Sequence, residues 1–163
     1  MDGTRKAGVV SGCDHIGIQV ADLDRSARFY EEKLGFEPVD RWTMSQEYVQ
    51  KVVGYHPDVT LEIALLAIPD TEVFLEILEY RGVEKAPIDP RTANPGTAHF
   101  CVFADDFDSL YERLVGEGVR FVSEPQTPTV GPNKGGRLVY MIDPDGIRVE
   151  LVQTSIRSDG SPR

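Results

Sequence analysis

The chain has 163 residues, of which 40% are hydrophobic and 27% charged, and its formal net charge is −10. This composition predicts one globular domain with a sizeable core, or two small modules that share one. The acidic balance excludes nucleic acid and anionic membranes as partners, because an acidic surface repels their phosphates. The sequence shows no secretory signal and no membrane-spanning run, and its two cysteines form no disulfide framework, so we expect a cytoplasmic protein.

The first half of the chain predicts a strand, a helix and three further strands. Residues 13–20 alternate apolar and polar side chains, the pattern of a strand with one buried face. Asp22 is a suitable N-cap for the helix that follows, and Gly35 ends that helix. Further strands are expected over 36–43, 59–68 and 72–80, and a short amphipathic helix or loop over 45–58.

The second half repeats this order after a proline-rich linker at 81–95. Residues 96–121 again predict a strand and a helix, and His99 follows His15 by 84 residues. We therefore expect an α+β fold of two tandem βαβββ modules. The expected segments are a flexible N-terminus at 1–12, a single domain at 13–153 and a tail at 154–163, and the domain comprises module 1 at 13–80, the linker, and module 2 at 96–153.

A tight turn precedes the last strand. In the tetrapeptide at 143–146, Pro144 presets its φ angle and Gly146 accepts a positive one. The strand that follows places Glu150 among apolar residues, as the last strand of the first module does with Glu76. A carboxylate on a half-buried strand needs a partner that offsets the cost of burying its charge.

Two histidines and two glutamates recur at equivalent positions of the two modules. His15 and His99 lie near the starts of the modules, and Glu76 and Glu150 lie in the final strands. A single residue of this kind more often faces solvent or makes a local hydrogen bond, but the duplication favours a metal site. Two imidazoles and two carboxylates suit one divalent ion, either Ni, Co, Zn, Mn or Fe. We therefore predict that these four residues are the metal ligands.

A glycine-rich loop at 123–137 carries two cations, Lys134 and Arg137. As a mobile lid, the loop would bring positive charge toward an anionic group of a substrate. A plain hairpin loop explains the same composition without any function. Lys134 and Arg137 are therefore candidate substrate-binding residues.

Four segments carry a resemblance to a known family. They are HIGIQVADLDRSARFYEEKLGFE, FLEILEY, GTAHFCVFADDFDSLYERL and GPNKGGRLVYMIDPDGIRVELV. In these segments, which span 13–153, the chain resembles the vicinal oxygen chelate superfamily of glyoxalase I, bleomycin resistance proteins and extradiol dioxygenases. The resemblance implies that the strands form a U-shaped mixed-sheet cup around one metal ion, and that the protein is a homodimer.

The ligand set His–Glu–His–Glu is most similar to that of glyoxalase I, the lactoylglutathione lyase. This similarity implies a metal-dependent lyase or isomerase that moves a proton next to a metal-bound carbonyl of a 2-oxoaldehyde–thiol adduct or a related small substrate. Glu76 and Glu150 would then be the catalytic bases as well as ligands. Gln19 replaces an Arg of glyoxalase I, and Tyr80 lies near the place of its Asn. Both are candidate substrate-binding positions, and both changes argue against glutathione.

Three other activities of the superfamily compete with this one. An epimerase of the methylmalonyl-CoA type would return the proton to the same carbon, but such enzymes usually carry Gln in place of Glu76. An Fe(II) extradiol-type dioxygenase uses two His and one Glu, and keeps a face open for O₂. A non-catalytic antibiotic-binding resistance protein usually lacks the ligands altogether. Because all four candidate ligands are present, proton transfer is the favoured activity.

Overall fold

The computed structural model describes residues 8–44, 46–56, 58–86 and 88–154. Most of the predicted N-terminus, residues 1–7, and of the predicted tail, residues 155–163, lies outside the described residues. One sheet contains β1 (His15–Gln19), β2 (Glu37–Met44), β3 (Thr60–Ala67) and β4 (Phe74–Arg81). The other contains β5 (His99–Phe103), β6 (Arg120–Phe121), β7 (Arg137–Ile142) and β8 (Arg148–Gln153).

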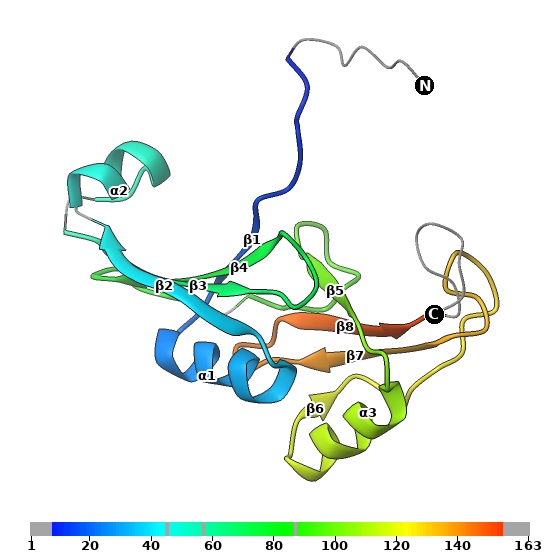
Figure 1. Ribbon diagram of the computed structural model, residues 1–163. Coiled ribbons are helices and arrows are strands. Elements are labelled where there is room, and N and C mark those ends of the chain that lie inside the picture. The colour runs from blue at the N-terminus through cyan, green and yellow to red at the C-terminus, as the bar shows by residue number, and fades with distance from the viewer. Residues whose placement is uncertain (1–7, 45, 57, 87, 155–163) are drawn as a thin grey trace.

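The two four-stranded sheets have the same topology (Figure 1). Their strand orders are β1-β4-β3-β2 and β5-β8-β7-β6. The first strand of each module pairs in parallel with the last, and the other neighbours are antiparallel. The predicted α+β fold with two βαβββ modules is confirmed. The modules differ most in their second strands, because β2 has eight residues and β6 only two.

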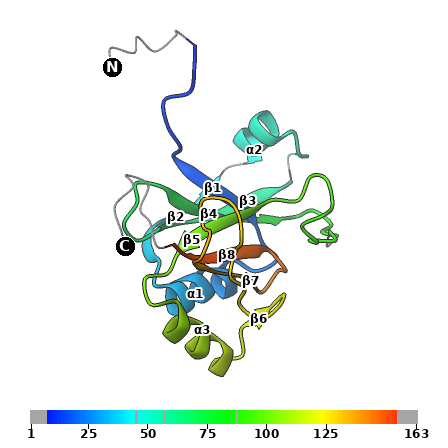
Figure 2. The same cartoon turned by 90° about the vertical axis from the view of Figure 1, so that its right-hand side faces the viewer.

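The helices are α1 (Leu23–Leu34), α2 (Gln46–Val53) and α3 (Phe107–Gly116). The side chain of Asp22 caps α1 by accepting a hydrogen bond from the Arg25 amide, and Gly35 ends it with a φ of 71°. The segment predicted as a helix or loop contains the helix α2. Figures 1 and 2 show α1 and α3 on one side of the sheets and α2 on the other. No helix within the described ranges is long and apolar enough to cross a membrane.

One hydrophobic core joins both modules. Tyr30 of α1 is fully buried, and its ring lies 6.1 Å from that of Phe100 on β5. Its hydroxyl donates a hydrogen bond of 2.9 Å to Asp143, in the turn before β8. The modules therefore pack on each other through α1 and through the inner faces of both sheets. Core residues from these faces include Ile18, Leu75, Ile77, Val139, Met141, Val149 and Leu151.

Strand alternation places the predicted ligands on the faces that do not join this core. Leu75 and Ile77 flank Glu76 and point into the core, and Val149 and Leu151 flank Glu150 in the same way. A smaller cluster forms on the outer face of the first sheet, where Val49 of α2 packs with Leu61, Ile63 and Leu78. The helix α2 therefore covers part of the face that carries Glu76.

Candidate metal centre

The first module brings His15 and Glu76 together. Because β1 and β4 are parallel neighbours, with Gly17 opposite Glu76, the two side chains leave the same face. His15 Nε2 lies 3.3 Å from Glu76 Oε2. The other ring nitrogen, Nδ1, lies 2.8 Å from Asp14 Oδ2. Asp14 therefore orients the ring from behind, as carboxylates behind metal-binding imidazoles do, and directs Nε2 toward Glu76.

The second module forms an equivalent pair. His99 Nε2 lies 3.1 Å from Glu150 Oε2, on the parallel strands β5 and β8. Tyr140 of β7 is directly opposite Glu150 and donates a hydrogen bond of 3.1 Å to the same oxygen. The Tyr140 hydroxyl also lies 3.4 Å from His99 Nε2. Glu150 is thus held by two neighbours, His99 and Tyr140.

Both pairs have the spacing that a shared metal ion requires. Two ligand atoms bound to one ion at about 2.0–2.2 Å, with angles of about 90–109°, are about 2.8–3.6 Å apart. The distances of 3.3 Å and 3.1 Å lie within this range. In the structure, the same two distances join ion pairs of imidazole and carboxylate. The donor types and the spacing of each pair therefore fit half of the coordination shell of a divalent ion.

The structure does not bring the four predicted ligands together in one chain. Within the described residues, no group of three or more His, Cys, Asp or Glu side chains is placed to hold one ion. The two pairs belong to separate sheets, with no hydrogen-bonded strand pair between them. One chain therefore supplies two half-sites, and the complete four-ligand site stays a prediction.

Two of the four predicted substrate-binding residues share a face with a half-site. Gln19 extends from the face of β1 that carries His15, and Tyr80 from the face of β4 that carries Glu76. The Tyr80 ring lies 5.3 Å from that of Tyr55, which follows α2. Burial raises the pKa of the Tyr80 phenol, and the nearby Tyr55 and Glu76 add to this effect. Tyr80 therefore stays an uncharged hydrogen-bonding group beside Glu76.

The two predicted lid cations are not gathered at a half-site. Lys134 is exposed in the loop before β7. Arg137 forms an ion pair of 3.0 Å with Asp108, and its guanidinium lies 5.6 Å from the centre of the Phe107 ring. Because Arg137 alternates with Tyr140 along β7, it faces α3 rather than Glu150. The position of Arg137 in the sequence could not reveal that Asp108 is its partner.

Sequence reasoning missed Tyr140 and Arg148 as site residues. The expected pairing of the last two strands could have revealed Tyr140, because a hairpin that turns at 143–147 places Tyr140 opposite Glu150. Arg148 stands two residues before Glu150, on the same face. Cys101 also faces Glu150, and burial together with this carboxylate raises the pKa of the Cys101 thiol to about 12. The thiol is therefore protonated at neutral pH and unsuited to be a nucleophile.

The Tyr140 hydroxyl is expected to strengthen metal binding. Burial and the adjacent Glu150 raise the pKa of Tyr140 to about 12, so the phenol remains a hydrogen-bond donor at neutral pH. Tyr140→Phe leaves the shape of the site and removes this donor. We expect metal affinity to fall about 10-fold or more, as when other outer partners of ligands are removed. Calorimetric titration with Zn²⁺ measures this, with Tyr111→Phe on α3 as the control, and equal affinities for all three proteins would contradict the role.

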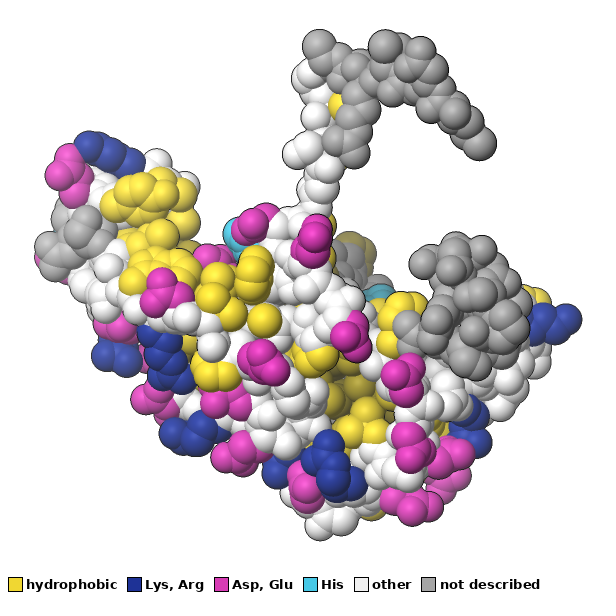
Figure 3. Space-filling model, in the orientation of Figure 1, with side chains coloured by type: hydrophobic (Ala, Val, Ile, Leu, Met, Phe, Trp, Pro, Cys, Tyr) yellow, Lys and Arg dark blue, Asp and Glu magenta, His cyan; other side chains and the backbone are white. Residues whose placement is uncertain are grey.

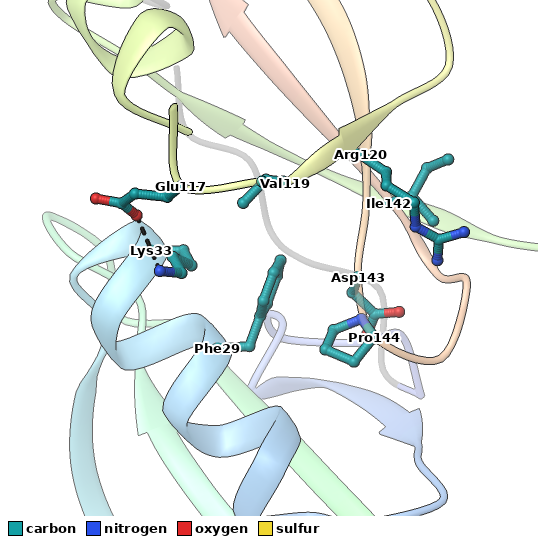
Figure 4. A pocket seen from close by; sticks show the side chains of 9 residues that line it. Phe29, Lys33, Glu117, Val119, Arg120, Ile142, Asp143 and Pro144 are labelled. Atoms are coloured by element: carbon teal, nitrogen blue, oxygen red, sulfur yellow. Dashed lines mark ion pairs between the residues drawn. The ribbon is translucent and has the colours of Figure 1, made fainter. Parts of the chain in front are cut away.

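The cleft at the junction of the modules is not part of either half-site. It has a volume of about 240 Å³ and lies between α1 and the segment that leads into β6 (Figure 4). Lys33 and Glu117 form an ion pair of 3.0 Å at its edge. Phe29, Val119, Arg120, Ile142 and Pro144 complete most of its lining. None of the predicted ligands lines this cleft, so the chemistry is expected on the outer sheet faces.

These observations define a class of protein, with tandem βαβββ modules and one His–Glu pair on each sheet. The family model described as Glyoxalase/Bleomycin resistance protein/Dioxygenase superfamily matches residues 12–151. The chain therefore belongs to this superfamily, and the expected membership is confirmed.

Individual relatives differ in the activity that their names give. The chain is 31% identical to a 2-epi-5-epi-valiolone epimerase from Actinomyces over 144 residues, which cover 85% of this chain and 76% of that protein. It is 30% identical to a probable chloroplastic lactoylglutathione lyase from Arabidopsis thaliana, covering 85% of this chain but only 35% of the plant protein. The crystal structure of a glyoxalase family protein from Bacillus cereus matches the fold with a TM-score of 0.73 and 23% identity, covering 92% of this chain and 99% of that one.

Proposed function

We propose that the chain is a divalent-metal-dependent enzyme that moves a proton at a carbon next to the carbonyl group of a small molecule. The observation that carries this proposal is the pair of matched half-sites. In each module a His on the first strand lies close to a Glu on the last strand, at distances of 3.3 Å and 3.1 Å. Relatives named as an epimerase and as a lactoylglutathione lyase support the same class of reaction. In both reactions a C–H bond beside a carbonyl must be broken and remade.

The bound ion would be held by His15, Glu76, His99 and Glu150, and would act as a Lewis acid on the carbonyl oxygen. The two carboxylates have different freedom to move. In the described structure, His15 is the only ionic or hydrogen-bonding partner of the Glu76 carboxylate, whereas Glu150 is held by both His99 and Tyr140. We therefore assign Glu76 as the base that removes the proton. Glu150 would act from the other side of the substrate after taking up a proton from solvent, and the proton left on Glu76 would be released to solvent to complete the cycle.

The favoured reaction is a glyoxalase-I-like isomerisation, in which the proton returns to the neighbouring carbon of a 2-oxoaldehyde–thiol adduct. Epimerisation is the second candidate, and the 31% identity to the Actinomyces epimerase favours it. In that case the proton returns to the opposite face of the same carbon. Neither Gln19 nor Tyr80 offers a cation for the carboxylate of glutathione, so we propose a different thiol or a thiol-free ketone as substrate.

Deuterium exchange tests both reactions at once. The Ni-, Co- or Zn-loaded protein is incubated in D₂O with a hemithioacetal of methylglyoxal or with 2-epi-5-epi-valiolone, and NMR follows deuterium at the carbon next to the carbonyl. We expect exchange with one of the two. Iron in the purified protein and oxygen uptake with catechols would indicate a dioxygenase instead. A protein that takes up no metal and exchanges no proton would be a binding protein.

We further propose that a homodimer completes the site, with one pair from each chain. The second copy supplies what one chain lacks, because the two pairs of one chain do not form a four-ligand group among the described residues. Apolar side chains gather over α2 and the adjoining sheet in Figure 3. Tyr48, Val52 and Tyr55 in and after α2 are 51%, 60% and 43% exposed. An apolar surface of this kind beside the Glu76 face suits contact with another protein chain.

Mixing two inactive variants tests the shared site. After subunit exchange between Glu76→Gln and Glu150→Gln dimers, a mixed dimer has one site with both changes and one with none. Half of the dimers are mixed, so about a quarter of the wild-type activity should return. If each site lay within one chain, every site would carry one change, and mixing would restore nothing.

We also propose a cytoplasmic setting. Cys13 and Cys101 are both free thiols, which suits a reducing compartment. The proposed partners are small molecules and a second copy of the chain, without nucleic acid or membrane.

A further inference from the structure

Arg148 lies beside the second half-site. It is the first residue of β8, two positions before Glu150, and in the parallel pairing of β5 with β8 it stands opposite His99. Side chains at these positions leave the same face of the sheet. The Arg148 guanidinium therefore shares the outer face with His99 and Glu150.

Among the described residues, one buried nitrogen of the Arg148 guanidinium, Nη1, lacks a hydrogen-bond partner. Six other arginines of this acidic chain have a carboxylate within 4.0 Å, namely Arg25, Arg41, Arg81, Arg91, Arg113 and Arg137. A buried, unpaired N–H of a charged group destabilises a fold. A cation kept in this state next to a candidate reaction centre is typical of a binding residue whose partner is a ligand.

We propose that Arg148 binds an oxyanion group of the substrate, a carboxylate or a phosphate. This inference rests on the proposed function of the His99–Glu150 half-site. The planar guanidinium suits both anions, because its two parallel N–H groups match two oxygens of either. Arg148 and Glu150 are two residues apart on one strand, which separates their α-carbons by about 6–7 Å. A substrate that contacts both residues would then be a small carbonyl compound that carries a carboxylate or a phosphate.

This assignment also accounts for the uncharged residues on the first sheet. Gln19 on β1 and Tyr80 on β4 share faces with the first half-site, and neither has a positive charge. Lys134 is exposed in its loop, and Arg137 is paired with Asp108 on the face toward α3. Arg148 is thus the cation that the second half-site offers to an anion.

The test compares Arg148→Met with Arg120→Met. Arg120 is an exposed arginine at the junction cleft, so its change is a matched control for the loss of one charge. The metal-free proteins are unfolded thermally in sodium phosphate, sodium acetate or sodium chloride at equal ionic strength. We expect phosphate or acetate to raise the Tm of the wild type and of Arg120→Met over chloride by more than that of Arg148→Met, because phosphate also stabilises folded proteins without a specific site. If phosphate gives the specific rise in Tm, the substrate group is a phosphate. If acetate gives it, the group is a carboxylate.

Two outcomes would overturn the inference. Equal stabilisation of all three proteins by the anions would mean that only adventitious ions bind. A Tm of Arg148→Met in chloride well below that of the wild type would mean that Arg148 supports the fold. Arg148→Lys keeps the positive charge but lacks the two parallel N–H groups of the guanidinium. It should therefore retain only part of the rise in Tm that the anion causes.

Metal titration separates this inference from the proposed function. Arg148→Met should bind Zn²⁺ with the wild-type affinity, because the four candidate ligands are unchanged. If the wild type binds no metal but gains stability from phosphate through Arg148, the anion site stands and the metal-dependent function fails. If metal binds and the anion effect is undiminished in Arg148→Met, the function stands and the anion site fails.

Discussion

Glu76→Gln in the metal-loaded protein is expected to lower kcat for proton exchange by about 10²–10⁴-fold, the usual contribution of a general base. The amide keeps the size of the side chain and can still bind a metal through its oxygen, but it cannot accept the proton. Glu150→Gln should also lower kcat, and should weaken metal binding more than Glu76→Gln does. The reason is that Glu150 is part of a hydrogen-bonded set with His99 and Tyr140.

Deuterium exchange gives kcat, and calorimetry gives metal affinity for the same samples. The matched control is Glu62→Gln on β3, because Glu62 is a partly buried strand glutamate that bonds to Thr43 rather than to a histidine. This control should keep wild-type values for both quantities. If Glu76→Gln and Glu150→Gln both stay within about tenfold of wild-type turnover, proton transfer by these carboxylates is ruled out.

Asp143→Ala is expected to lower the free energy of unfolding by about 3–5 kcal/mol, since each unsatisfied buried group costs about 1–3 kcal/mol. Asp143 is 1% exposed. Its Oδ1 accepts hydrogen bonds from the amides of Asp145 and Ile147, at 2.9 Å and 2.7 Å, and its Oδ2 accepts from the Tyr30 hydroxyl. Alanine leaves two amides and a buried phenol without partners. Urea unfolding measures the loss.

Asp143→Asn is the matched variant. Its side-chain oxygen can still accept from both amides, so we expect a loss of only about 1 kcal/mol, the worth of one hydrogen bond. Burial raises the pKa of the Asp143 carboxyl above its usual 3.8, so the folded state binds this proton more tightly than the unfolded state. Its contribution to stability is thus full below pH 3.8 and falls as the pH rises through the folded-state pKa. As the pH rises through this pKa, the free energy of unfolding of the wild type should fall relative to that of Asp143→Asn. An alanine variant as stable as the asparagine variant would contradict this account.

The same turn connects stability to the site. Asp145 accepts hydrogen bonds from the Ala21 amide, at 3.0 Å, and from Arg25 and Ser26 at the start of α1. Gly146 has a φ of 92°, as predicted for this turn. The turn therefore attaches the start of β8, and with it Glu150, to the first module. Loss of Asp143 is expected to weaken metal binding together with the fold.

The sequence by itself determined the elements, the tandem modules and the two His–Glu pairs. Alternation along a strand decides which face a residue occupies, and a βαβββ repeat places the first strand beside the last. These two local rules were enough to bring His15 to Glu76 and His99 to Glu150. They also predicted the cap at Asp22 and the helix end at Gly35, because both depend on backbone geometry within one turn.

The tertiary structure alone decided how the modules pack and what surrounds each pair. The placement of Tyr30 against Phe100 and Asp143 depends on contacts between residues 70 or more positions apart, which no local pattern encodes. The same packing keeps the two half-sites of one chain from forming a single metal-ligand group within the described residues. It turns Arg137 toward Asp108, and it leaves Arg148 Nη1, on the face that carries Glu150, without a hydrogen-bond partner among the described residues. The periodicity of a strand fixes the face of a side chain, whereas its partner depends on which surface is packed against that face.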